Sequence, residues 1–209
     1  MSFGGFQIMR AAALTFRSSC YTSAPKWAAL VAIIAPLALG GCAADVPLEQ
    51  PSMYFNMAES GARLDSEAAA TMISLYRKNN RLGAVVIDRE LMKVAEAQAQ
   101  AMASRNKLDH DAKAPLPKRL QAAGYQATLA VENVSAGYHT LAEAFSGWRD
   151  SPPHRANMLQ DGVTKMGIAA SYAPNTKYKV FWTLILASNE PRDRLGVPLP
   201  TGLVDATQN

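Results

Sequence analysis

The sequence of 209 residues contains only two cysteines, Cys20 and Cys42, and both lie near its start. No cysteine follows Cys42, which excludes a disulfide framework and a thiol nucleophile from the rest of the chain. A domain built from that remainder must be stabilised by its hydrophobic core, and residues 43–209 are numerous enough to form one. We expect a single globular domain.

Acidic residues are absent from the first 41 positions, which contain three basic residues. An apolar stretch follows over residues 27–39 and ends in Gly40 and Gly41, directly before Cys42. The stretch is shorter than the roughly 20 apolar residues that span a bilayer. A basic start, a short apolar run and small residues instead predict a cleaved signal peptide over residues 1–41.

The segment Leu39–Cys42, Leu-Gly-Gly-Cys, resembles the lipobox of bacterial lipoproteins. The resemblance implies that Cys42 becomes the acylated first residue of the mature chain, exported and held at a membrane by lipid. The alternative is a plain secretory signal cleaved near Ala43 or Ala44, which leaves the position of the cysteine unexplained. By the same resemblance, Ala43 would permit sorting to the periplasmic side of the outer membrane in a Gram-negative envelope.

Clustered positive charge is also lacking after the predicted signal peptide. Of 21 Lys and Arg, three belong to residues 1–41, so residues 42–209 carry 18 basic and 17 acidic residues, a net charge of +1. Nucleic-acid binding depends on clustered cations that neutralise phosphates, so we expect no nucleic-acid partner. No polybasic block is present to attract anionic lipid.

Helical periodicity dominates the first part of the domain. Helices or helical turns are expected over about 65–80, 89–102, 115–123, 141–148 and 151–155. Asp65 and Ser151 are suitable N-caps, and Pro152 would occupy the first helical position after Ser151. Gly124 would end the third helix.

Two strands, 166–172 and 178–187, are expected to form a hairpin near the end of the domain. In the second strand, one face would carry Tyr178, Val180, Trp182, Leu184 and Leu186, and the other Phe181 and Ile185. A strand that is apolar on both faces is covered on both faces. The pattern predicts an α/β fold with three layers, in which helices cover both faces of a central sheet.

The expected organisation has four parts. Residues 1–41 form the signal peptide, 42–61 a tether, 62–190 the domain and 191–209 a loose tail. The tether would allow the domain to extend away from the membrane.

Several segments in this order resemble the CAP superfamily, named after cysteine-rich secretory proteins, antigen 5 and pathogenesis-related proteins. They are Leu75–Arg77, Leu108–His110, Ala123–Tyr125, Val131–Val134, Trp148–Leu159 and Met166–Ile168. The string Trp-x-x-Ser-Pro-x-His-Arg-x-Asn-x-Leu at residues 148–159 is the most specific of them. The resemblance covers about residues 67–188 and implies a central, mainly antiparallel sheet between helices.

The resemblance also implies a cleft where two histidines and two glutamates converge, which in some members binds a divalent metal. By motif, these residues map onto His110, His154 and Glu132. The second glutamate has no clean counterpart, because Ser151 stands where many eukaryotic members have it, and Glu143 is taken as its stand-in. Two imidazoles with two carboxylates would suit a zinc-like ion with an open coordination position.

Each candidate also has a structural interpretation. His110 could be a surface histidine after a helix, and His154 could be held by packing alone. Glu132 could bond the backbone amides of a loop. Glu143 follows Thr140 at the spacing of a capping box, in which the glutamate serves its own helix. The third histidine, His139, has no counterpart in the family and is expected to be a loop residue.

Two common catalytic motifs are absent. The chain has no His-Glu-x-x-His helix, and Ser135 does not lie in a Gly-x-Ser-x-Gly elbow. Arg155 and Asn157 are expected to bond local backbone, and Trp148 and Trp182 are expected in the core.

Two functions from different classes follow. The first is a non-catalytic binding module for a lipid, a peptidoglycan fragment or a protein partner. The second is a metal-dependent hydrolase, in which a glutamate acts as general base on metal-bound water. An inert spacer in the envelope is a third possibility, since a fold does not fix a function.

Overall fold

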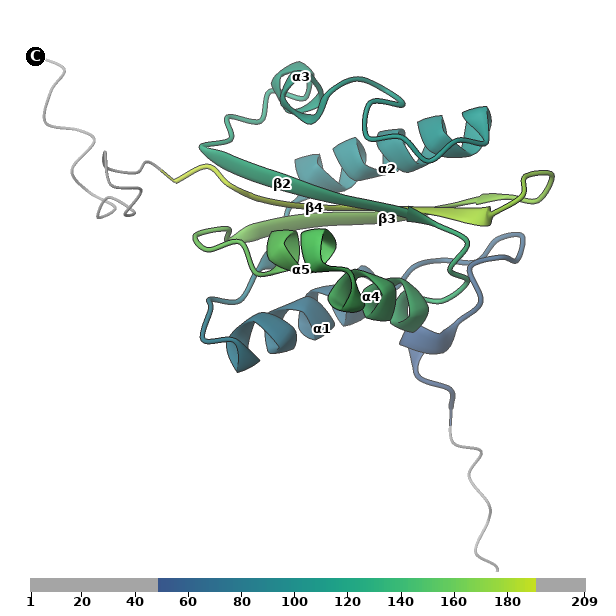
Figure 1. Ribbon diagram of the computed structural model, residues 1–209, viewed down its shortest axis with the longest axis horizontal. Coiled ribbons are helices and arrows are strands. Elements are labelled where there is room, and N and C mark those ends of the chain that lie inside the picture. Colours follow the sequence, from purple (N-terminus) through teal and green to yellow (C-terminus); the bar gives the residue numbers. More distant parts are fainter. Residues whose placement is uncertain (1–48, 191–209) are drawn as a thin grey trace, which may run out of the picture. The chain divides into compact units, whose positions relative to one another are not determined.

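A single sheet separates two layers of helices (Figure 1). The computed structural model describes residues 49–190. Its strands are β1 (Val86–Ile87), β2 (Leu129–Ala136), β3 (Lys165–Ala173) and β4 (Lys179–Ser188). The order is β1-β3-β4-β2. The pair β1–β3 is parallel, whereas β3–β4 and β2–β4 are antiparallel. The predicted three-layer α/β/α fold with a mainly antiparallel sheet is confirmed.

The helices begin close to the predicted positions. They are α1 (Ser66–Asn79), α2 (Arg89–Arg105), α3 (Leu116–Ala122), α4 (Leu141–Asp150) and α5 (Pro152–Met158). Helices α2 and α3 cover one face of the sheet, and α1, α4 and α5 cover the other (Figure 1). The Asp65 carboxylate caps α1 by accepting from Ala68 N at 2.9 Å. Ser151 precedes α5 as predicted, but its side chain makes no capping bond.

Strand β4 is buried on both faces, as its sequence predicts. Trp182 lies in one apolar cluster with Trp148 of α4, and their rings meet edge to face with centroids 6.5 Å apart. On the opposite face, Ile185 packs with Leu91 of α2. Burial of large aromatic and aliphatic side chains on both sides is the main source of stability for a domain without disulfides.

Tyr178 lies on the other side of the sheet from the one predicted. Strict alternation would place it with Val180, but Lys179 between them has a φ of +65°. This left-handed residue interrupts the extended backbone at the start of β4, so that Tyr178 packs edge to face on Phe181 at a centroid distance of 5.9 Å.

The sequence pattern did not predict strand β2, because polar residues lie within it. Glu132, Asn133 and Ser135 are all buried, and the whole strand pairs with β4 in antiparallel register from Leu129↔Ser188 to Ala136↔Phe181. Alternation of apolar residues, the usual mark of a half-buried strand, is therefore absent. Glu132, for which the structural interpretation assumed a loop, lies on a strand at the edge of the sheet.

Part of the segment expected as a tether packs against the domain. Ser52–Tyr54 forms a short 3-10 helix, and Met57 is buried in the apolar cluster below the sheet. The Met57 amide donates to the His139 carbonyl at 2.7 Å. The compact part of the chain thus begins earlier than residue 62. The predicted signal peptide, Cys42 and the C-terminal tail lie outside the described residues.

A buried arginine, Arg77 of α1, connects that helix to the loop after α5. The side chain is 1% exposed. Its Nε donates to Gly83 O at 2.8 Å, and its Nη1 donates to Met158 O at 2.9 Å and to Gln160 O at 2.8 Å. Burial lowers the pKa of Arg77, an effect that the nearby Asp161 opposes. In residues 49–190, no helix has the length and apolar character needed to cross a bilayer.

Candidate functional site

Glu132 brings together side chains from three parts of the domain. Its Oε2 lies 3.0 Å from Nδ1 of His110, in the loop after α2, and its Oε1 accepts from Nη2 of Arg119, on α3, at 2.8 Å. The Glu132 and Arg119 side chains are each 4% exposed, whereas the His110 side chain is 59% exposed. A buried carboxylate is thus paired with a buried guanidinium on one side and with an accessible imidazole on the other.

The Arg119–Glu132 pair explains how a carboxylate is tolerated in the interior. An unpaired buried charge is strongly unfavourable, while a close, charge-assisted hydrogen bond offsets much of the desolvation cost. With Oε1 held by Arg119, the carboxylate presents Oε2 to His110. Because an ionised carboxylate only accepts hydrogen bonds, Nδ1 of His110 carries the proton, and Nε2 is left as the nitrogen for an external ligand.

His154 lies on α5 and interacts electrostatically with His110. Its side chain is partly buried. Burial lowers the pKa of His154 from its ordinary value of 6.5, and repulsion between the rings of His154 and His110, when both are protonated, lowers it further. The neutral imidazole, which can accept a hydrogen bond or bind a metal, is therefore favoured at neutral pH.

The lowered pKa of His154 predicts a pH dependence of stability. A depressed pKa in the folded state means that the contribution of His154 is complete above 6.5 and is lost as the pH falls through the lowered value. We expect its NMR titration to give a pKa below 6.5, and a His110→Ala variant to move that pKa only part of the way back, since burial is the larger cause. A His154 pKa at or above 6.5 would contradict this assignment.

Two asparagines fix α5 against β2 and so set the position of His154. Asn133 Nδ2 donates to the His154 carbonyl at 2.9 Å. Asn157 Nδ2 donates to Asn133 Oδ1 and to Glu132 O, both at 2.9 Å. The prediction that Asn157 bonds the backbone of its own turn is therefore wrong. Its partners belong to β2, whose outer edge has carbonyl groups that the sheet does not pair.

Two residues that the sequence interpretation missed hold the loop that carries His110. Gln98 of α2 is fully buried, and its Nε2 donates to the carbonyls of Asp109 and His110, both at 2.8 Å. Arg119 Nε donates to Ala114 O at 2.6 Å, and its Nη2 lies 3.3 Å from His110 O. A signal for Gln98 was available, because it occupies a core-facing position on the apolar stripe of α2 between Leu91 and Met102.

Glu143 caps its own helix. Its Oε2 accepts from the backbone amides of His139 at 2.7 Å and Thr140 at 3.1 Å. Thr140 Oγ1 in turn accepts from the Glu143 amide at 3.2 Å. This capping box was one of the two interpretations of Glu143, and it occupies the carboxylate at the exposed start of α4. The structure joins His110 to Glu132 by a hydrogen bond and places His154 where His110 affects its pKa, and it gives Glu143 a separate role.

The donor set for a metal is incomplete in residues 49–190. There, no three His, Cys, Asp or Glu side chains are arranged so that they could hold an ion. Nε2 of His110 and the ring of His154 are available as nitrogen ligands, but both oxygens of Glu132 are engaged by Arg119 and His110. A zinc site with three or four protein ligands does not fit these residues as they are arranged.

Comparison with known proteins agrees with the fold and the motifs. The model of the CAP, or cysteine-rich secretory protein, family matches residues 71–186. The uncharacterized protein YkwD of Bacillus subtilis strain 168 is 30% identical over 95 residues, which are 44% of this chain and 37% of that protein. The chain therefore spans little more than a third of this relative's length.

Solved structures show the same fold. An extracellular protein with an SCP domain from Bacillus anthracis has a TM-score of 0.51 at 25% identity, over 58% of this chain and 39% of its own. An outer surface protein from Borrelia burgdorferi has a TM-score of 0.54 at 21% identity, over 59% of this chain and 92% of its own. With the motif order, the sheet topology and the family match all in agreement, the chain belongs to the CAP, or cysteine-rich secretory protein, family.

Proposed function

We propose that this chain is an exported envelope protein whose CAP domain binds a ligand without catalysing a reaction. The observation that carries the proposal is the state of Glu132. A general base needs a carboxylate oxygen that can reach substrate or water, whereas both Glu132 oxygens are occupied and the side chain is 4% exposed. The accessible groups at the site are the two imidazoles.

The chemistry of the site favours a polar ligand that donates hydrogen bonds. Arg119 neutralises the only buried carboxylate of the site, and the lowered pKa of His154 keeps that ring neutral. Nε2 of His110 is a free acceptor in the neutral tautomer that Glu132 selects. Sugar hydroxyls and backbone amides offer such donors, which favours a peptidoglycan fragment or a protein segment over the acyl part of a lipid.

Binding can be tested directly with isolated peptidoglycan sacculi. We expect the purified protein to co-sediment with sacculi, and the His110→Ala/His154→Ala variant to lose most of that binding while its thermal unfolding midpoint is kept. His139→Ala is the matched control, because His139 is exposed and lies outside the site. Equal binding by the double variant and the control would exclude these histidines as ligand contacts.

The membrane anchor is proposed from the leader, together with the names of the relatives as extracellular and outer surface proteins. In cells given a labelled fatty acid, we expect the full chain to incorporate label and a Cys42→Ser variant to incorporate none. The variant should then be recovered in the soluble envelope fraction or the medium. Label that persists after Cys42→Ser would place any lipid elsewhere.

One observation favours the alternative, a metal-dependent hydrolase. The carboxylate of Glu132 contacts Nδ1 of His110, and metal-bound histidines are commonly oriented in this way through their second ring nitrogen. In that case His110 and His154 would supply two ligands, and other ligands would have to come from water or substrate.

A further inference from the structure

A groove of about 360 Å³ lies between α2 and α3, apart from the histidine site. Its apolar lining is formed by Val94, Ala97, Ala114, Ala122 and Ala123. These small side chains leave a shallow apolar surface of the size that small ligands use. Figure 1 shows α2 and α3, the two helices that line the groove, on the same side of the sheet.

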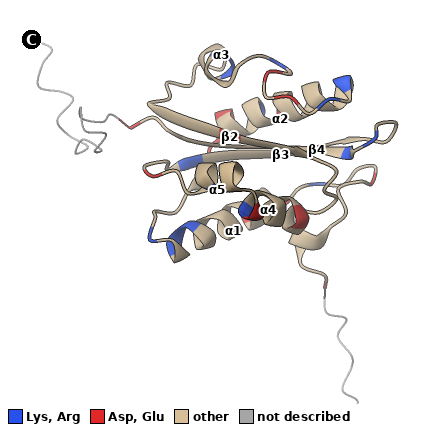
Figure 2. Cartoon of the chain, viewed as in Figure 1, with Lys and Arg blue, Asp and Glu red and all other residues tan. Residues whose placement is uncertain are grey.

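Positive charge surrounds this apolar surface. Lys93, Lys113 and Lys118 line the groove together with one acidic residue, Glu90. Glu90 is bonded to Lys93, at 2.9 Å. Among the ion pairs of residues 49–190, none includes Lys113 or Lys118. The charges come from three elements, α2, the following loop and α3 (Figure 2), which is why no basic run is visible in the sequence.

Arg119 adds an unsatisfied donor in the lining of the same groove. Its Nε and Nη2 are bonded to Ala114 O and to Glu132, but Nη1 is buried and has no hydrogen-bond partner in the described structure. A buried donor without an acceptor is unfavourable, and an anionic oxygen that enters the groove beside Arg119 would supply one. The Arg119 side chain is 4% exposed and is held by its bonds to Ala114 O and Glu132, whereas Lys113 and Lys118 are exposed.

We propose that the α2–α3 groove binds a monomeric, single-chain amphiphile with a carboxylate head. The head lies against Lys113, Lys118 and Arg119, and the apolar chain lies over the alanines and Val94. This is a second ligand site, which goes beyond the function proposed for the histidines. Arg119 is the only residue common to both, through its bond to Glu132.

Calorimetric titration of the purified protein with hexanoate and octanoate, below their micelle concentrations, tests the proposal. We expect one saturable site and a dissociation constant that falls about four-fold for each added methylene, or about fifteen-fold between the two ligands. Octanol, which has no charge, should bind at least about ten-fold more weakly than octanoate. The dependence on chain length separates the groove from simple attraction between charges.

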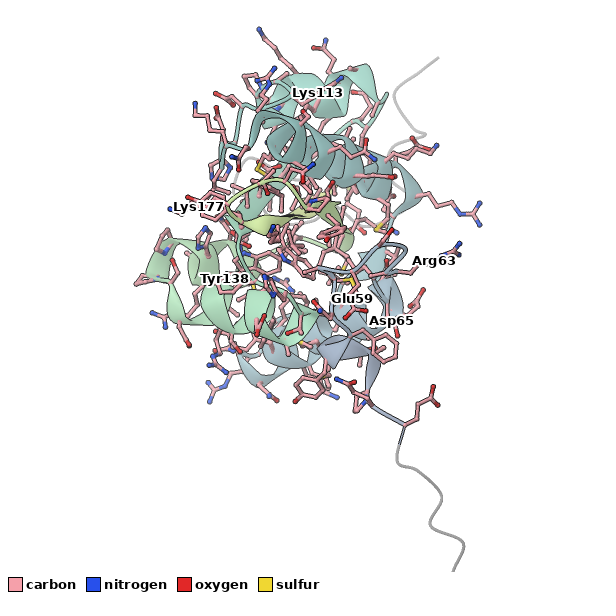
Figure 3. All side chains as sticks on the ribbon, turned by 90° about the vertical axis from the view of Figure 1, so that its right-hand side faces the viewer. Glu59, Arg63, Asp65, Lys113, Tyr138 and Lys177 are labelled. Carbon is pink, nitrogen blue, oxygen red and sulfur yellow. The ribbon has the colours of Figure 1, made fainter. Side chains whose placement is uncertain are left out.

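Two variants locate the site. Lys113→Glu/Lys118→Glu should weaken octanoate binding by about ten-fold or more, and Ala122→Trp should block it by filling the groove. The matched control is Lys78→Glu/Lys177→Glu, which makes the same change of net charge on other elements; Figure 3 shows Lys113 and Lys177 in separate parts of the molecule. His110→Ala/His154→Ala should leave octanoate binding unchanged, so that failure of one site does not imply failure of the other.

Three results would overturn the proposal. The first is the absence of saturable octanoate binding by the native protein. The second is an equal loss of binding in Lys113→Glu/Lys118→Glu and in the control, which would mean that net charge alone is responsible. The third is binding that is unaffected by Ala122→Trp or by chain length.

Discussion

Replacing Glu132 by alanine is expected to lower the free energy of unfolding by about 3–5 kcal/mol. Within residues 49–190, the change removes the only carboxylate that contacts Arg119, at 2.8 Å, and leaves the guanidinium, 4% exposed, with an uncompensated charge. It also releases His110, whose Nδ1 is oriented by the same carboxylate. Urea denaturation of the native protein and the variant at pH 7 measures the difference.

A surface ion pair in the same protein provides the control. Arg149 and Asp150 make a contact of the same length, 2.8 Å, but their side chains are 46% and 67% exposed. Asp150→Ala should cost little, because water screens an exposed ion pair. In a double-mutant cycle, Arg119→Met and Glu132→Leu should show a coupling of about 2 kcal/mol or more. A cost for Glu132→Ala no larger than that of Asp150→Ala would contradict the buried pair.

Arg77→Met is expected to destabilise the protein about as much as Glu132→Ala, with a loss of about 4 kcal/mol or more of unfolding free energy. The substitution keeps most of the apolar volume but removes the donors to Gly83 O, Met158 O and Gln160 O, which join α1 to the loop before β1 and to the end of α5. Because Met158 ends α5, the change should also loosen the helix that carries His154. Denaturation and the NMR line width of His154 report the two effects.

The neighbouring residue tests whether the effect is specific to Arg77. Lys78 follows it in α1 but is exposed, so Lys78→Ala should stay within about 0.5 kcal/mol of the native protein. Arg77→Lys should recover little of the loss, because a single ammonium cannot reproduce the planar fork of a guanidinium. Full recovery by lysine would show that charge alone matters at this position.

Periodicity and caps were sufficient to predict most of the fold. The aspartates at 65 and 88 mark the starts of α1 and α2, and their carboxylates accept from first-turn amides in the structure. The apolar alternation of β4 correctly predicted a strand that is covered on both faces. These patterns are local: a capped helix and a strand buried on both faces can each be recognised from their own residues, without knowledge of the rest of the fold.

The features that the sequence did not predict depend on contacts between residues that are distant in the sequence. Strand β2 has buried polar residues whose partners lie on α3 and α5, so its pattern does not identify it as a strand. Arg119 was missed because its role exists only once α3 lies next to β2, thirteen residues further along the chain. Glu143 had two interpretations from sequence, and the local one, the capping box, is the one found. Sequence spacing alone could not show that Glu132 bonds His110 or that His110 lies near enough to His154 to affect its pKa.

The scaffold of the site is more extensive than the histidines themselves. Gln98 and Arg119 hold the His110 loop, and Asn133 and Asn157 hold α5. Gln98, Asn133 and Asn157 act through backbone carbonyls and through one another, whereas Arg119 also binds the carboxylate of Glu132. Substitution of these residues should therefore alter the histidine site by displacing the imidazoles, without removing a group that contacts ligand in that site.

The most direct test is the divalent metal content of the purified protein after zinc loading and dialysis, measured beside the His110→Ala/His154→Ala variant. We predict substoichiometric metal in both, with no effect of a chelator on ligand binding, because Glu132 is occupied by Arg119 and His110 and the imidazoles alone make an incomplete set. Stoichiometric zinc in the native protein that is lost in the folded double variant would contradict a metal-free binding site. That outcome would favour a metal-dependent hydrolase.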